Sequence, residues 1–340
     1  MKIVKRILLL LLVILLLAVI INYPKLNIIA GYSAKNTASS VFLGSRSLSF
    51  TDTTDNNFSP VNLAHNTIDE KNETATSSVF GLLTRKAITR TGLGSVLTLT
   101  QQDEKSTYLT PKRIKTTNEI KSYPYGNAPH KDSVFDNIDY DKLNETVASI
   151  FGKRKTRALL ILHKDKIIAE KYAKGFTKDS RILGWSMTKS ILGLLVGIAF
   201  DQKKLESLDD RIDKYVPQLV GHTFGDITIR NLLNMSSGID ICESFCSPNN
   251  GFERYGYSQI GYSPRRGMDT DQRRGIMTFK WGRNETQGQK FNYTDLNPVL
   301  MAWVLVYAYQ MPLHQIAEQN LWQPLGAASD ATWLTDSKGF

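Results

Sequence analysis

A serine and a lysine three residues apart are the best candidates for covalent chemistry in this sequence. Ser186-Met187-Thr188-Lys189 is the only S-x-x-K in the chain. A serine hydroxyl is a poor nucleophile until a base takes its proton, and a lysine can be that base. Positions i and i+3 share a helix face, so the two side chains can meet. The alternative is that Ser186 caps the helix and Lys189 is a solvated side chain.

The predicted helix that carries this pair covers residues 186–200, SMTKSILGLLVGIAF. It is almost wholly apolar after Ser190, so we expect it to be buried nearly all round. A lysine one turn into such a helix needs a polar partner or a solvent cleft. Burial would lower the pKa of Lys189 and favour the neutral form that accepts a proton. The helix N-terminus would favour negative charge on the Ser186 hydroxyl.

Other elements are predicted around this helix. Apolar residues at helical spacing predict a helix over 139–151. The runs 157–163 and 166–172 flank a polar turn, which is typical of two antiparallel strands. Two more helices are predicted over 228–235 and 297–309.

Several motifs follow one another in the order found in a known superfamily. They are Arg157 to His163, Glu170-Lys171-Tyr172, Gly175-Phe176, Gly184 to Ser190, Leu194 to Gly197, Tyr215-Val216-Pro217 and Ile227 to Gly238. Over about residues 139–340 the sequence resembles the serine beta-lactamase and penicillin-binding-protein-like superfamily. It is most similar to the class C-type and 6-aminohexanoate-oligomer-hydrolase-like esterases and amidases. Weaker similarity extends to residues 31–35 and 92–94.

The resemblance implies an α/β (α+β) fold, in which an antiparallel sheet flanked by helices is joined to an all-helical subdomain. It also implies a serine hydrolase that forms an acyl-enzyme on Ser186. Its substrate would be a small amide, ester or beta-lactam-like molecule. The five histidines have no metal-ligand spacing, so we predict no metal and no other cofactor.

The superfamily further implies a Tyr-x-Asn motif, or a relative of it, downstream of the serine. Tyr125-Gly126-Asn127 has the right letters but precedes Ser186. Tyr293 follows Ser186 by 107 residues and stands just before an apolar segment, so we choose Tyr293. Its phenol would share a proton with Lys189 and Ser186 and pass it to the leaving group.

Asp295 stands where the superfamily often has asparagine. A carboxylate beside Lys189 would raise the pKa of that lysine and keep it charged, which leaves the identity of the base open. Asn297 is then the alternative source of the amide. We predict both Asp295 and Asn297 as substrate-binding residues.

The superfamily's third motif, Lys-Thr-Gly or a variant of it, has no match after Tyr293. We therefore expect the last strands of the sheet and the closing helix to be missing. One of the two amides that stabilise the oxyanion would be missing with them. The 340-residue chain is thus expected to be weakly active or inactive. A non-catalytic binding or regulatory protein on the same scaffold is the alternative.

The N-terminus has the pattern of an export signal. Residues 7–21 are fifteen apolar residues without a charge, and Lys2, Lys5 and Arg6 precede them. A retained anchor is favoured over a cleaved signal, because no small-residue cleavage site follows. The charge bias predicts a single-pass anchor in a bacterial inner membrane, with the catalytic region facing the periplasm or exterior.

Three regions are predicted along the chain. Residues 1–22 are the signal anchor, and residues 23–133 are a polar, partly ordered exported arm with a hairpin around 92–94. Residues 134–340 are an incomplete hydrolase domain. Cys242 and Cys246 are compatible with a local disulfide, free thiols or a metal site.

The formal net charge of +10 is compatible with a partner that is a nucleic acid or an anionic membrane. The basic residues are scattered along the chain, so we predict no nucleic-acid partner. A basic membrane-surface protein in which the S-x-x-K is accidental remains a third interpretation. The sequence predicts no particular oligomeric state.

Overall fold

The computed structural model describes most of the chain. The described residues are 2–23, 26–110, 134–153, 155–240, 262–263, 267–268, 271–278, 282–283, 285–327 and 329–340. The Tyr125 motif and both cysteines lie outside these ranges. The chain divides into two compact units: residues 1–111, 185–316 and 332–340 form the first, and residues 112–184 and 317–331 form the second. The fold is mixed α/β with antiparallel sheets.

The apolar N-terminal run lies in helix α1 (Lys2–Asn22), where the leucines at 8–12, 16 and 17 are exposed. In the part of the chain that the structure describes, no helix combines the length and hydropathy required for a membrane crossing. The predicted transmembrane helix therefore has no support from the structure, and export stays a prediction.

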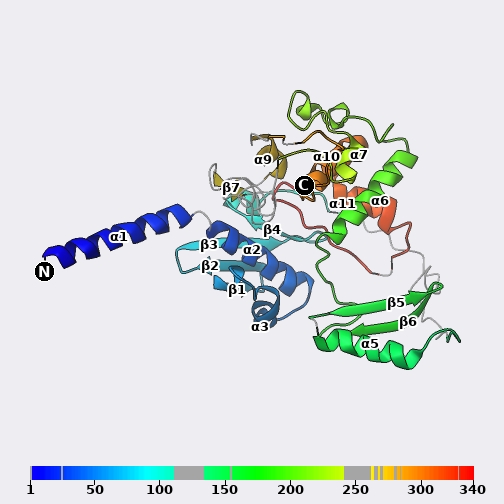
Figure 1. Cartoon of the computed structure of the whole chain (residues 1–340), viewed down its shortest axis with the longest axis horizontal. Helices are drawn as coiled ribbons and strands as arrows, with labels where there is room; N and C mark the ends of the chain where they lie inside the picture. Colours follow the sequence, from blue (N-terminus) through cyan, green and yellow to red (C-terminus); the bar gives the residue numbers. More distant parts are fainter. Residues whose placement is uncertain are drawn as a thin grey trace. The chain divides into compact units, whose positions relative to one another are not determined.

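An α/β layer follows in the first unit. Helix α2 (Leu26–Ala38) packs against a four-stranded antiparallel sheet (Figure 1). The strands are β1 (Ala64–Asp69), β2 (Thr74–Val79), β3 (Leu83–Thr89) and β4 (Ser95–Thr98), in the spatial order β1-β2-β3-β4. The hairpin predicted around residues 92–94 is confirmed as the β3–β4 connection. The short helix α3 (Leu48–Phe50) contacts β1, and the short helix α4 (Gln101–Glu104) contacts β4.

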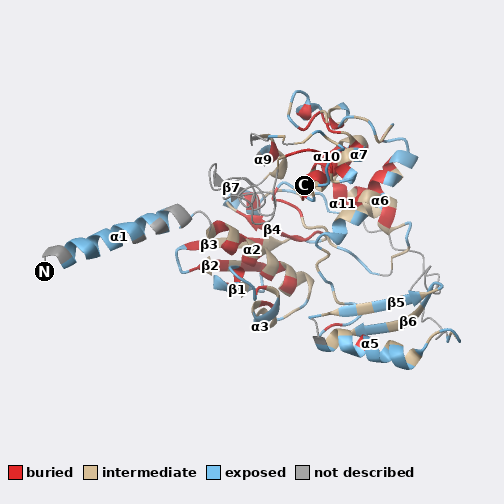
Figure 2. Ribbon diagram, viewed as in Figure 1, coloured by how far each residue is buried: buried red, intermediate tan, exposed pale blue. Residues whose placement is uncertain are grey.

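Small side chains bring α2 close to the sheet. Ala34 and Ala38 of α2 are fully buried against Ala75 and Ala87 of the strands (Figure 2). A surface of alanines lets a helix approach a sheet closely. Each alanine methyl group that leaves water on packing still contributes to the hydrophobic stabilisation. The prediction of a partly ordered arm did not include this layer, because small and polar residues give α2 a weak helical pattern.

A buried polar cluster joins α2 to the sheet. Ser33 Oγ donates to Asn66 Oδ1 at 2.7 Å, and Ser77 Oγ donates to the same oxygen. Asn66 Nδ2 donates to Asp52 Oδ1 at 2.7 Å. Buried polar groups are tolerated only when such partners replace water, so Asn66 fixes how α2 sits on β1 and β2.

The C-terminal residues of the chain pack against the same sheet. Arg90, which is 2% exposed, donates to the carbonyl oxygen of Ser337 at 3.0 Å and lies 3.5 Å from that of Asp336. The Asp336 carboxylate accepts from the backbone N–H of Lys338 at 2.9 Å and of Phe340 at 3.0 Å. The residue after β3 is thus joined to residues 336 and 337 through buried hydrogen bonds.

The remaining helices of the first unit carry the predicted site. They are α6 (Met187–Asp201), α7 (Ile229–Leu233), α9 (Gln272–Thr278), α10 (Leu296–Tyr309) and α11 (Leu313–Ala317), with the short strands β7 (Tyr262–Ser263) and β8 (Gly267–Met268). Helix α10 contacts both α6 and α7. The helices predicted over 186–200, 228–235 and 297–309 are therefore confirmed.

The prediction that α6 is buried nearly all round is wrong. Leu192, Leu195 and Val196 are buried, but Met187 is 69% exposed and Leu194 is 54% exposed. The reason is that the described elements contacting α6 cover one side of it only. An apolar sequence alone cannot say which of its faces will be covered.

The second unit contains a helix and a strand pair. Helix α5 (Tyr140–Lys153) precedes β5 (Ala158–His163) and β6 (Lys166–Tyr172), which pair antiparallel as predicted. Lys164 and Asp165 form the two-residue turn, and both adopt the left-handed conformation with φ of 47° and 56°. A two-residue turn of this hand matches the twist of the strands that it joins.

The buried polar cluster of the α/β layer gives a stability prediction. Replacing Asn66 with alanine removes the acceptor of two buried serine hydroxyls, and each unsatisfied group costs about 1–3 kcal/mol. We expect Asn66→Ala to lower the free energy of unfolding by about 2–4 kcal/mol in urea denaturation followed by circular dichroism. His65→Ala, at an exposed position on the same strand, is the control and should change it by less than about 0.5 kcal/mol. Equal effects of the two variants would contradict the assigned role of Asn66.

Candidate active site

Ser186 immediately precedes α6, but its hydroxyl does not cap that helix. It occupies the N-cap with φ −66° and ψ −10°, and its side chain makes no capping hydrogen bond. Instead Lys189 Nζ donates to Ser186 Oγ at 3.1 Å. The geometry disfavours the interpretation of Ser186 as a helix cap. The exposed hydroxyl is open to a substrate while it contacts an amine.

Lys189 has a second partner from another helix. Its Nζ forms a hydrogen-bonded ion pair with Asp295 Oδ1, and both side chains are 17% exposed. Asp295 is the N-cap residue of α10, and its side chain likewise makes no capping bond. The hydroxyl of Thr294 lies 3.4 Å from the backbone N–H of Asn297 and partly takes that place. Two N-cap residues, Ser186 and Asp295, thus meet at one lysine.

The segment before α10 is held in place by the turn after α7. The backbone N–H of Asn292 donates to the carbonyl of Met235 at 2.7 Å, and that of Gly288 donates to the carbonyl of Ser236 at 2.7 Å. Met235 adopts the left-handed conformation, with φ 53°. These contacts fix the path of the chain immediately before Tyr293.

Tyr293 lies beside the same lysine. Lys189 Nζ is 4.9 Å from the centroid of the Tyr293 ring, within the range of a cation–π interaction. The ring is 47% exposed, so it is accessible to a molecule that approaches Ser186. The structure therefore brings Ser186, Tyr293 and Asp295 together around Lys189.

Opposing influences act on the pKa of Lys189. Burial lowers it, but the hydrogen bond and charge of Asp295 raise it, and the interaction with Tyr293 raises it further. The net pKa lies above the ordinary value of 10.5. Of the two expectations for this lysine, neutral through burial or charged beside a carboxylate, the structure favours the charged one.

The pH dependence of the ion pair follows from this direction. A group whose pKa is raised by folding binds its proton more tightly in the folded chain. Its contribution to stability is therefore complete below pH 10.5 and is lost as the pH rises through the folded pKa of Lys189. Lys189 stays charged throughout the physiological range.

Asn297 has different contacts from those of Ser186, Tyr293 and Asp295. It is fully buried in the first turn of α10, and its Nδ2 is 3.5 Å from the sulfur of Met235. Its Oδ1 has no hydrogen-bond partner among the described residues. These contacts tie α10 to the end of α7, which suits a residue that positions the helix.

Trp185 is a residue of this site that sequence reasoning missed. It precedes Ser186, is 53% exposed, and has φ 47°, in the left-handed region that bulky residues rarely adopt. Its ring stacks on that of Tyr32, with the centroids 6.0 Å apart. No short-range pattern in the sequence links residues 32 and 185.

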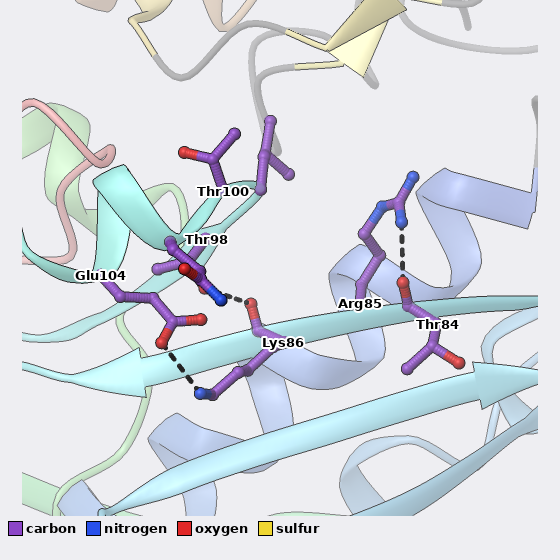
Figure 3. A pocket seen from close by; sticks show the side chains of 8 residues that line it. Thr84, Arg85, Lys86, Thr98, Thr100 and Glu104 are labelled. Atoms are coloured by element: carbon purple, nitrogen blue, oxygen red, sulfur yellow. Dashed lines mark hydrogen bonds and ion pairs between the residues drawn. The ribbon is translucent and has the colours of Figure 1, made fainter.

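A cavity of about 240 Å³ lies elsewhere in the first unit, between β3, β4 and α4 (Figure 3). Lys86 and Glu104 in its wall pair with each other at 3.0 Å. Its lining includes none of the predicted site residues. Among the described residues, no three His, Cys, Asp or Glu side chains gather as a metal site would require.

Comparison with known proteins adds to this geometry. Residues 144–339, more than half of the chain, match the model of the beta-lactamase family. The residues similar to that family thus begin after β4, so the weak similarity at 31–35 and 92–94 lies outside the match. The chain is also 29% identical over 185 residues to the 6-aminohexanoate-dimer hydrolase of Paenarthrobacter ureafaciens. That alignment covers 54% of this chain and 46% of the hydrolase, so the chain spans about half the length of this curated relative.

Solved structures show similarity over the same share of the chain. A putative 6-aminohexanoate-dimer hydrolase from Bacillus anthracis gives a TM-score of 0.47 at 18% identity, covering 57% of this chain and 52% of that one. A putative beta-lactamase from Bacteroides dorei DSM 17855 gives 0.43 at 22% identity, covering 55% and 52%.

The ion pair with Asp295 gives a prediction for the pKa of Lys189. Replacing Asp295 with asparagine removes the carboxylate that opposes the effect of burial, so the pKa of Lys189 should fall. The measurement is the pH titration of the Lys189 Cε resonance by NMR on 13C-lysine-labelled protein, assigned with Lys189→Arg. Glu285→Gln is the matched control, because Glu285 pairs at 3.1 Å with the exposed Lys290 and should leave Lys189 unchanged. An unaltered midpoint in Asp295→Asn would show that the pair does not set the charge of Lys189.

Proposed function

Because the chain belongs to the beta-lactamase family, within the serine beta-lactamase and penicillin-binding-protein-like superfamily, we propose that it is a serine hydrolase with Ser186 as the nucleophile. The observation that carries this proposal is the bond from Lys189 Nζ to Ser186 Oγ at 3.1 Å, in place of a helix cap. A hydroxyl that stabilised only the helix would point at the backbone N–H groups of the first turn. The proposed substrate is a small amide or ester, or a beta-lactam-like ring.

The first proposed step is acylation. Ser186 Oγ attacks the substrate carbonyl, a C–O bond forms, and the bond from the carbonyl carbon to the leaving nitrogen or oxygen breaks. The proton of Ser186 is transferred to the leaving group. Water then hydrolyses the ester on Ser186 and releases the acid. Helices α6 and α10 both have their N-termini at this site. The positive ends of the two helix dipoles favour the negative charge that develops on Ser186 Oγ and on the carbonyl oxygen of the substrate.

The route of the proton follows from the charge of Lys189. A protonated lysine donates to Ser186 Oγ and stabilises the alkoxide, but it cannot accept the proton. We assign the transfer to Tyr293, whose phenol both accepts and donates and lies beside the lysine. Asp295 keeps Lys189 charged and in position. This arrangement makes the lysine an electrostatic partner of the nucleophile rather than a free base.

A binding or regulatory protein on the same scaffold is the second candidate. The charged state of Lys189 favours it, because a Ser-Lys pair in which lysine is the base needs a neutral amine. The two candidates differ in whether Ser186 forms a covalent bond.

We also propose that the chain is exported and retained at a bacterial inner membrane by residues 1–22, with the hydrolase region outside the cytosol. The support is the charged N-terminal residues followed by fifteen apolar ones.

Covalent labelling tests the nucleophile. A fluorophosphonate probe should label the native chain on one residue, identified by mass spectrometry as Ser186. Ser186→Ala should abolish the label, whereas Ser190→Ala, one turn along the same helix, should retain it. A native chain that takes no label would favour the binding protein, and labelling of Ser186→Ala would reject Ser186 as the nucleophile.

The same assay separates the roles around Ser186. Lys189→Ala should slow labelling at least about 100-fold, because it removes the group that stabilises the alkoxide. Tyr293→Phe should slow it less if water or Asp295 relays the proton. A Lys189→Ala chain that reacts at the native rate would contradict the proposed arrangement.

Protease added to spheroplasts tests the topology. Residues 134–340 should be digested while a cytosolic marker is protected, because the charge bias favours a cytosolic N-terminus. Leu10→Arg interrupts the apolar run and should release the chain from the membrane fraction. Full protection of residues 134–340 would count against export.

A further inference from the structure

Three aromatic rings gather next to the nucleophile, and two of them come from the N-terminal α/β layer. Tyr32 of α2 stacks on Trp185 with 6.0 Å between centroids and 19° between ring planes. Phe58 meets Tyr32 edge to face, at 5.5 Å and 88°. Both arrangements lie in the favourable range for aromatic pairs. We call Tyr32, Phe58 and Trp185 the aromatic wall.

The wall offers apolar surface to solvent. Trp185 is 53% exposed and Phe58 is 44% exposed. Burying a large aromatic ring is favourable, so a molecule that covers the exposed surfaces of Trp185 and Phe58 would gain hydrophobic contact. Trp185 also immediately precedes Ser186 at the start of α6, so the wall includes the residue next to the proposed nucleophile.

The conformation of Trp185 adds to this argument. Its left-handed φ of 47° costs energy for a bulky residue, and such conformations cluster where the surroundings impose them. The stacking contact with Tyr32 is one interaction that holds Trp185 in this conformation. The contact orients the Trp185 ring at the start of α6, where Ser186 is placed.

Two of the three residues of the wall lie outside the range that matches the family model. Tyr32 and Phe58 precede the residues that match the beta-lactamase family, which begin at 144. The N-terminal layer therefore contributes side chains at a site whose nucleophile lies in the matched region.

We propose that the aromatic wall binds the acyl group of the substrate, and that this acyl group carries an aromatic or similarly flat apolar substituent. The proposal rests on the proposed function for its orientation: Tyr293 is assigned to deliver a proton to the leaving group, and we therefore assign the acyl portion to Trp185. Acylation then joins Ser186 Oγ to a carbonyl carbon whose substituent lies on the rings, and the leaving group departs with the serine proton.

Binding of a simple carboxylic acid tests the wall independently of catalysis. The chain has five tryptophans, and 5-fluorotryptophan labelling with 19F NMR resolves them, Trp185 being assigned with Trp185→Phe. Phenylacetate should shift the Trp185 resonance of Ser186→Ala, in which no covalent reaction occurs. Acetate, which lacks the ring, should leave this resonance unmoved at the same concentration.

Variants of the wall make the test specific. Tyr32→Leu should weaken phenylacetate binding about fivefold, the scale expected when one aromatic contact is lost. Tyr32→Phe keeps the ring and should bind as the parent does, and Phe58→Leu provides a second variant if Tyr32→Leu does not fold. A Trp185 resonance that phenylacetate leaves unmoved, or equal affinities in Tyr32→Leu and Tyr32→Phe, would overturn the proposal.

A kinetic comparison separates this inference from the proposed function. The native chain is mixed with 4-nitrophenyl phenylacetate and with 4-nitrophenyl acetate, and nitrophenolate release gives kcat/KM for each. The ratio should favour phenylacetate and fall about fivefold in Tyr32→Leu, whereas general loss of structure would lower both rates equally. Binding at Trp185 without any nitrophenolate release would reject the proposed function and support the wall. Nitrophenolate release at equal kcat/KM for the two esters would support the proposed function and reject the aromatic wall as the acyl-binding site.

Discussion

The ion pair between Lys189 and Asp295 is the interaction on which the site depends. A lysine one turn inside an apolar helix is costly to bury alone, and a carboxylate at the start of α10 offsets that cost. The pair also sets the distance between α6 and α10 at their N-termini. Because both helices begin at this point, one contact aligns Ser186, Lys189 and Tyr293.

The same contact explains the chemistry that the site favours. Burial and the neighbouring carboxylate act in opposite directions on Lys189, and the carboxylate and phenol prevail. An asparagine in place of Asp295 would leave a lysine that loses its proton more readily. The single aspartate therefore favours a fixed positive charge over a neutral amine next to the Ser186 hydroxyl.

Sequence reasoning found the elements that local patterns specify. The β5–β6 pair, α6 and α10 follow from apolar spacing and polar turns. The choice of Tyr293, which lies beside Lys189, followed from motif order. The covered face of α6 could not be predicted, because it depends on which distant elements pack on Leu192, Leu195 and Val196. The α/β layer was missed because alanines and serines, which permit close packing, carry little hydrophobic pattern. The contact of Tyr32 with Trp185 joins residues 153 positions apart and leaves no local trace.

The hydrogen bonds from Arg90 to the C-terminal residues also constrain how the chain folds. Their partners are 246 and 247 positions downstream, so these hydrogen bonds form only after residues 336 and 337 have been made. Until then the N-terminal sheet holds a charged guanidinium that lacks these acceptors, and loop closure over such a separation is slow. A ribosome adds about 5–20 residues per second, so the α/β layer waits tens of seconds for its last contacts. During that interval the Arg90 guanidinium must stay hydrated, because a charged group that is buried without acceptors is costly.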